Sequence, residues 1–155
     1  MLLRRQKRSG AILVESALIY PIVFIVMLAT ISLGIAVFRY QQVSHIARES
    51  SRWASVHGAR YHRETGLPAA TPDTVYSNVI VPQSAGMKPE NIAYSVTWNT
   101  NNEQTHTGTR VDPTTGETKV LAISNTVTVT VTYTWNTGLF GTIPVSSTST
   151  VCMSY

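Results

Sequence analysis

The chain has 155 residues, 43% of them hydrophobic, with one cysteine and a formal charge of +4 at pH 7. This length supports one modest domain, or a membrane helix joined to a small domain. Four of the twelve basic residues, Arg4, Arg5, Lys7 and Arg8, lie in the first ten positions, and the other eight equal the eight acidic residues in number. No basic patch therefore remains for nucleic acid. The single cysteine, Cys152, excludes an internal disulfide framework; we interpret it as a strand residue, with pairing between subunits as the alternative.

A long apolar segment follows the basic start. Residues 17–38 contain no charged side chain, and as a helix they span about 33 Å, against about 30 Å of hydrocarbon in a bilayer. The sequence predicts a transmembrane helix over 11–38, with the basic end held in the cytoplasm. A secretory signal cleaved after Ala36 is the alternative. It is disfavoured because the apolar region of such a signal is only about 7–15 residues long.

The helical pattern continues beyond the membrane segment. Over 39–57, small and apolar residues recur at spacings of three and four: Val43, Ala47, Ser50, Ser51 and Ala54. This pattern predicts an amphipathic helix with a small-residue face, stopped by Gly58. As one helix, residues 11–57 would be roughly 70 Å long.

The membrane segment has two features of its own. Pro21 deletes a backbone hydrogen bond and invites a kink, which membrane helices tolerate. Ala29, Ser32 and Ala36 share one face at i, i+3 and i+7, a spacing that lets another helix approach closely. The alternative is that these small residues fall there by chance.

The extracytoplasmic region, 58–155, reads as β-rich. Strict alternation predicts a half-buried strand over 126–135, which 119–123 could extend. Further strands are predicted over 91–98 and 143–153, where Pro144 indicates an edge or bend, and a weaker one over 74–81. The polar stretch 99–118 is a loop or an exposed hairpin, with a turn at 112–116. The predicted fold class is α+β: a small antiparallel sheet on the outer half of the long helix, which supplies much of its core.

Glu15 is the one charged residue within the apolar run 11–38. A carboxylate there costs about 2.5–3.5 kcal/mol if it is deep in the bilayer. A cut between Gly10 and Ala11 would remove all four leading charges and create an amine at Ala11. That amine and Glu15 of a neighbouring helix, 4 Å apart, would gain about 4 kcal/mol at a dielectric of 20. The alternative is that Glu15 is an interfacial residue near the cytoplasmic end.

At these residues a resemblance to a known family emerges. The segment 8–15 resembles the prepilin-peptidase site of type IV pilins and pseudopilins. Residues 10–18 with Pro21, and 40–58, resemble the TadE-like family, which supplies minor pilins or pseudopilins to the tight-adherence (Flp) pilus. The C-terminal strands are similar more loosely, and 61–119 is not covered. Ser16, where major Flp pilins tend to have Tyr, favours a minor subunit.

The resemblance implies a biological setting as well as a site. Prepilin peptidase would process the chain between Gly10 and Ala11, and Glu15 would be the assembly carboxylate. The partners would be other pilin subunits and the inner-membrane pilus assembly machinery. The precursor would span the bacterial cytoplasmic membrane once, and the assembled protein would lie in an extracellular pilus or the periplasm.

Other functions have weaker support. His45, His57 and His62 lack zinc-ligand spacing, and no phosphate loop or nucleophile setting is visible, so we expect no enzyme, cofactor or metal. The three tryptophans (Trp53, Trp98, Trp135) are interpreted as packing residues, with sugar or surface binding as the alternative. The alternative function is an unprocessed bitopic membrane protein with a partner- or surface-binding β domain.

Overall fold

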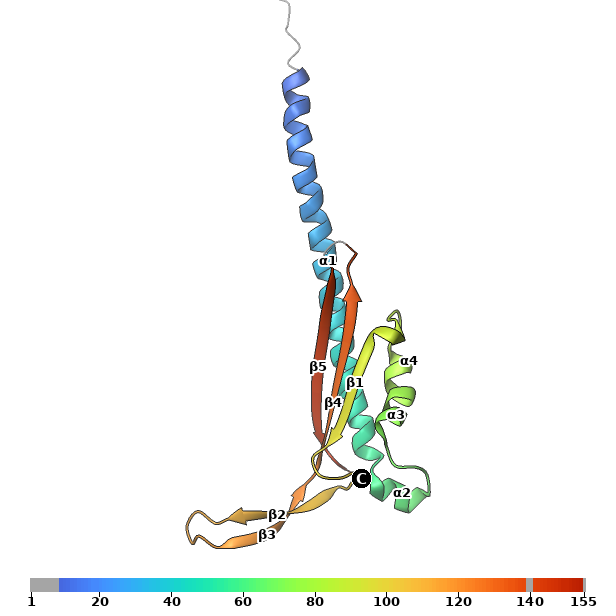
Figure 1. The fold of residues 1–155 in the computed structure, drawn as a ribbon, viewed down its shortest axis with the longest axis vertical. Helices are drawn as coiled ribbons and strands as arrows, with labels where there is room; N and C mark the ends of the chain where they lie inside the picture. Colours follow the sequence, from blue (N-terminus) through green and yellow to red (C-terminus); the bar gives the residue numbers. More distant parts are fainter. Residues whose placement is uncertain (1–8, 139–140, 155) are drawn as a thin grey trace, which may run out of the picture. The chain divides into compact units, whose positions relative to one another are not determined.

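The computed structural model describes residues 9–138 and 141–154 and has an α+β fold, as predicted (Figure 1). Its helices are α1 (Ser9–Val56), α2 (Ala59–Thr65), α3 (Pro72–Val75), η1 (Tyr76–Ile80), α4 (Val81–Gln83) and η2 (Pro89–Asn91). Its strands are β1 (Ile92–Trp98), β2 (Thr105–Val111), β3 (Thr118–Ser124), β4 (Thr126–Asn136) and β5 (Thr142–Cys152). The chain divides into two compact units between Phe38 and Arg39.

The first unit consists of the apolar part of α1. The helix continues through Pro21, and from Ile12 onward it is long and apolar enough to cross a membrane, with a mean hydropathy of 2.5. None of that apolar window is buried. Large side chains such as Leu18 and Phe24 are 71% and 59% exposed. So much uncovered apolar surface requires lipid or other helices around it.

The second unit begins with the outer part of α1, and here the predicted small-residue face is confirmed. All five of its members are fully buried: Val43, Ala47, Ser50, Ser51 and Ala54. Their size lets the helix backbone lie close to the sheet. The predicted role of Gly58 is wrong. Helix α1 ends at Val56, and Gly58 has φ −76° and precedes α2 instead of providing a left-handed helix stop.

A three-stranded antiparallel sheet, in the order β1-β4-β5, lies against this face of α1. The predicted strand over 126–135 is confirmed as the central strand β4. Its alternate residues Val127, Val129, Val131 and Tyr133 are buried, and Trp135 is half-buried. The predicted strands 91–98 and 143–153 are β1 and β5, and β5 is an edge strand as Pro144 indicated.

Contacts between helix and sheet join residues far apart in the chain. Val43 and Ile46 of α1 share one buried cluster with the valines of β4. The hydroxyls of Ser51 and Ser149 lie 2.8 Å apart, and the N–H of Ser154 donates to the carbonyl of Ser55 at 2.9 Å. The outer part of α1 therefore covers the apolar side of the sheet, as predicted.

The strand predicted over 74–81 is wrong, because this segment is helical. Thr71 and Thr74 form a capping box, and Pro72 occupies the first helical turn, where its missing N–H costs nothing. Val75 and Ile80 enter the same buried core, and Val79 is buried as well. The helical spacing of these residues and the Thr-Pro start are the sequence signals that indicate a helix here.

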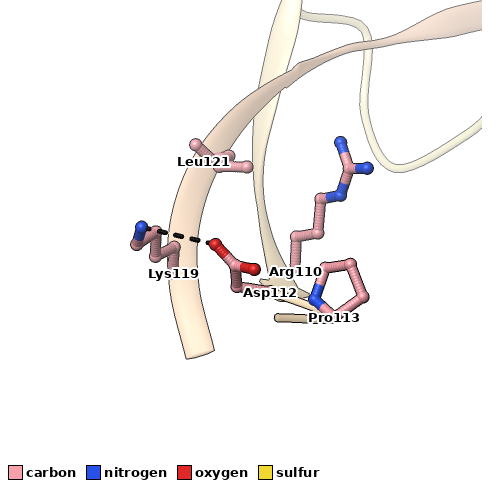
Figure 2. Close-up of a pocket in the computed structure, with 5 residues that line it drawn as sticks. All are labelled: Arg110, Asp112, Pro113, Lys119 and Leu121. Atoms are coloured by element: carbon pink, nitrogen blue, oxygen red, sulfur yellow. Dashed lines mark ion pairs between the residues drawn. The ribbon is translucent and has the colours of Figure 1, made fainter. Parts of the chain in front are cut away.

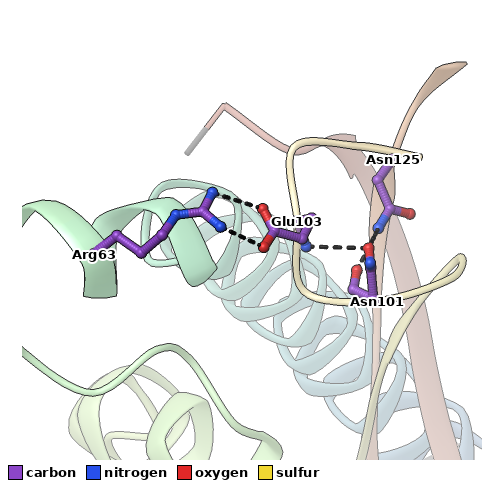
Figure 3. Close-up of polar contacts among 4 residues, drawn as sticks. All are labelled: Arg63, Asn101, Glu103 and Asn125. Atoms are coloured by element: carbon purple, nitrogen blue, oxygen red, sulfur yellow. Dashed lines mark hydrogen bonds and ion pairs between the residues drawn. The ribbon is translucent and has the colours of Figure 1, made fainter. Parts of the chain in front are cut away.

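Residues 119–123 do not extend β4, because Asn125 interrupts the chain between β3 and β4. Its side-chain oxygen accepts from the N–H groups of Thr126 (2.9 Å) and Thr100 (3.3 Å), and its amide donates to the carbonyl of Asn101. Figure 3 shows Asn125 and Asn101 beside the Arg63–Glu103 ion pair. This fully buried asparagine directs β3 into a separate sheet with β2.

Of the two alternatives predicted for the polar stretch 99–118, a loop or a hairpin, the hairpin is found. Strands β2 and β3 are joined by the predicted turn. The N–H of Thr114 donates to Asp112 Oδ1 at 2.9 Å, and Gly116 has φ +70°, a conformation that glycine adopts without strain. That backbone hydrogen bond holds the pKa of the Asp112 carboxyl below its ordinary value. Lys119 Nζ lies 3.7 Å from the same carboxylate (Figure 2).

Candidate functional site at the start of the helix

Gly10 lies in the first turn of α1, and the fold itself gives no packing reason for glycine there. A Cβ at this position would meet no described atom within 4 Å. Its neighbour Ala11 is also helical, whereas the basic residues Arg4, Arg5, Lys7 and Arg8 lie outside the described residues. The role of Gly10 in processing stays a prediction.

Glu15 lies on α1, exposed, one turn beyond Ala11. Its flanking residues Leu13, Val14 and Leu18 are exposed and apolar. The described residues include no ion-pair partner for its carboxylate. In an apolar medium an unpaired carboxylate is unfavourable, so a partner for Glu15 has to come from outside the described residues.

The three predicted packing residues lie further along the same helix. Ala29, Ser32 and Ala36 are half-buried, while the larger residues around them are exposed. Their helical spacing places them on one side of α1, next to the exposed side chain of Leu33. Their role against a second helix stays a prediction.

An aromatic ladder at the far end of α1 was not singled out in the sequence. The rings of Trp53 and His57 stack with centroids 4.0 Å apart, and Tyr61 follows at 4.6 Å. His57 Nδ1 lies 2.8 Å from the carbonyl of Trp53. The spacing of four residues between these rings was the available signal. Trp53, Trp98 and Trp135 pack against the buried core, which supports a packing role for the tryptophans.

Potential metal ligands do not cluster in the described part of the chain. No group of three His, Cys, Asp or Glu side chains lies close enough to hold an ion there. His45 and His62 are exposed on α1 and α2, and Cys152 is an exposed thiol at the end of β5.

The model of the family described as TadE-like protein matches residues 10–52 of the chain. The matched segment contains Gly10, Glu15 and most of the small-residue face of α1. Comparisons with curated proteins and with solved structures each gave no match. The resemblance found in the sequence is therefore confirmed for the helix, and the β-rich region beyond it is not covered.

The matched segment and the apolar helix together define the class of protein. They indicate a membrane-anchored protein whose N-terminal helix is similar to that of TadE-like proteins. The fold is consistent with a membrane anchor. The first part of the long helix exposes apolar side chains that suit lipid, and its second part packs against a small sheet that suits water.

Proposed function

We propose that the chain is a structural minor pilin or pseudopilin of the tight-adherence pilus, and not an enzyme. It would be inserted once in the cytoplasmic membrane with its N-terminus inside, cut between Gly10 and Ala11 by prepilin peptidase, and then built into the filament or used to prime it. The observation that carries this proposal is Glu15, a carboxylate on an uncovered apolar helix within the segment that matches the TadE-like family.

The mechanism follows from the charges around the cut. Before cleavage, the basic leader keeps its end of the chain in the cytoplasm. After cleavage, the four leading charges are gone and Ala11 carries a free amine. A neighbouring helix, offset along the common axis, can then place its Glu15 beside this amine. The attraction between the two groups offsets the cost of the carboxylate in lipid only when subunits assemble, so pairing favours the filament over the monomer.

The N-terminus of the mature protein tests the proposal. The protein is extracted from membranes of a strain with an active prepilin peptidase, and its mass is measured. We expect the first ten residues to be missing and Ala11 to be the first residue, with or without a methyl group on the amine. The control is the same strain without the peptidase, in which Met1 is retained.

Two results would contradict the proposal. An intact leader in the presence of active peptidase would favour the alternative, an unprocessed bitopic protein whose β domain binds a partner or surface. A mature chain that starts at Val37 would indicate a secretory signal and a released protein.

A further inference from the structure

Strand β5 is an open edge of the three-stranded sheet. Among the described residues it pairs only with β4, from Thr142 to Cys152, in a register without a slip. None of its eleven residues is charged, and its one proline lies near its start. Proteins usually protect such edges with lysines, bulges, prolines or a covering element, because the free N–H and C=O groups pair readily with another strand. After Pro144, β5 contains no lysine, no further proline and no bulge that would protect its edge.

The core is also less well covered beside β5 than beside β4. The inward residues of β4 are at most 5% exposed from Val127 to Tyr133. On β5, Val145 is buried at 7% exposure, whereas Ser147, Ser149 and Val151 are half-buried and Ile143 is 38% exposed. An additional strand at this edge would complete the apolar side of the sheet.

The β2–β3 hairpin is the second unpartnered β structure of the chain. Each of its strands pairs only with the other, and an isolated two-stranded hairpin is marginal in water. Apolar side chains are exposed on both of its faces: Val111 59%, Val120 70%, Leu121 43% and Ile123 41%. Arg110 and Lys119 lie directly opposite each other, a like-charge pairing that Asp112 only partly offsets (Figure 2).

We propose that β3 of one copy of this chain adds to the free edge of β5 of a second copy and extends its sheet across the interface. Strand addition to a sheet edge is an established mode of recognition. Strand β3 is favoured over β2 because it carries three of the four exposed apolar residues of the hairpin. Its only charge, Lys119, meets no charge on β5. We choose a second copy of this chain as the partner because the chain itself contains both the free edge of β5 and the free edge of β3.

The geometry also sets the type of assembly. The two edges are different segments, so the contact is heterologous and leaves one β5 edge and one hairpin free at the ends. Such contacts extend into open chains unless their rotation closes a ring. This inference goes beyond the pilin proposal, and it does not require cleavage after Gly10.

Disulfide trapping between two tagged copies tests the proposal in membranes of cells that express the full-length chain. Both copies carry Cys152→Ser. One has cysteine at Ser146, Thr148 or Thr150 on the outer face of β5, and the other has cysteine at one of the positions 119–123 of β3. After mild oxidation, we expect disulfides between the two tags at alternate β3 positions only, because side chains on a strand alternate between faces.

A matched control places the cysteine at Ser95, which lies on the same outer face of the sheet but on β1, and we expect no disulfide there. A second measurement uses Thr148→Lys with Thr150→Lys, which should abolish trapping through Ser146, whereas Ser95→Lys should leave it unchanged. The proposal is overturned if no β3 position is trapped, if all five are trapped equally, or if Ser95 is trapped as well as β5. Dominant pairing between two β5 cysteines would also overturn it. In each case the mass of the mature N-terminus remains a separate test of the pilin proposal.

Discussion

At the scale of single residues, two polar side chains in this protein have opposite surroundings. Asn125 is fully buried, and both ends of its amide have backbone partners. Glu15 is exposed on an apolar helix without an ion-pair partner among the described residues. A buried polar group stabilises a fold only when it is hydrogen-bonded, so Asn125 has a structural role within one chain. For Glu15 we propose a partner on a neighbouring subunit.

Replacing Glu15 tests this distinction. We expect Glu15→Val to leave membrane insertion intact, because removing the carboxylate lowers the cost of inserting the helix. Incorporation into pili should fall, because the amine of a neighbouring Ala11 loses its partner. The measurement is the amount of this protein in sheared pili relative to its amount in the membrane. Equal incorporation of the variant and the wild type would mean that Glu15 is only an interfacial residue.

Replacing Asn125 should destabilise the junction between hairpin and sheet. Asn125→Ala removes a fully buried amide and takes the acceptor away from the N–H groups of Thr100 and Thr126, at a cost of about 1–3 kcal/mol. The control is Asn78→Ala, at an exposed position in η1. Proteolysis of the full-length protein in detergent at increasing urea should show a lower midpoint for Asn125→Ala alone. Equal midpoints would show that the Asn125 contacts contribute little to stability.

At the scale of elements, the packing of β4 on α1 depends on two matched patterns. Small residues recur along α1 with helical spacing, and valines recur along β4 with a period of two. The opposite face of β4 carries threonines, and Thr128, Thr130 and Thr132 each pair with a hydroxyl of β5 at 2.9 Å. The two faces of one strand therefore differ sharply in their tolerance of charge.

Adjacent substitutions on β4 measure this difference. Val129→Asp places a carboxylate at a position with no exposure, and burial of an unpaired polar group costs several kcal/mol, about 4 or more in an apolar site. Thr130→Asp, on the opposite face, loses one hydroxyl contact and should cost about 1 kcal/mol. Limited proteolysis of both full-length variants in detergent should show rapid cleavage only for Val129→Asp. Equal resistance would contradict the observed packing of β4 against α1.

At the scale of the whole molecule, the chain has two units with different solvent requirements. The unit before Arg39 exposes an apolar helix, and the unit from Arg39 onward has a buried core and a surface with fewer exposed apolar side chains. The boundary falls at the first charged residue after Glu15. A membrane around the first unit and water around the second would satisfy both requirements.

The orientation across the membrane follows from the basic leader. We expect residues 58–155 to lie outside the cytoplasmic membrane, because Arg4, Arg5, Lys7 and Arg8 hold the leader inside. Protease added to intact spheroplasts should cleave a tag at the C-terminus, and it should leave a tag before Met1 intact in a strain without the peptidase. Protection of the C-terminal tag until the cells are lysed would show the opposite orientation.

The sequence alone determined the parts of this protein that depend on local periodicity and on charge. These are the apolar helix, its small-residue face, the alternation of β4, the strands β1 and β5, and the anomaly at Glu15. Each follows from a repeat of 3.6 or 2 residues, or from one charge in an apolar run. Gly10 was likewise conspicuous in the sequence, and the structure adds that no internal packing requires glycine there.

Only the tertiary structure decided the remaining features. The segment 74–81 is helical because Val75 and Ile80 reach the core from a helix that starts at Pro72, although its valines and isoleucine also suit a strand. The break between β3 and β4 depends on hydrogen bonds from Asn125 to residues about 25 positions earlier, which no local pattern reveals. The open edge of β5 follows from strand order, and strand order depends on which distant segments pair.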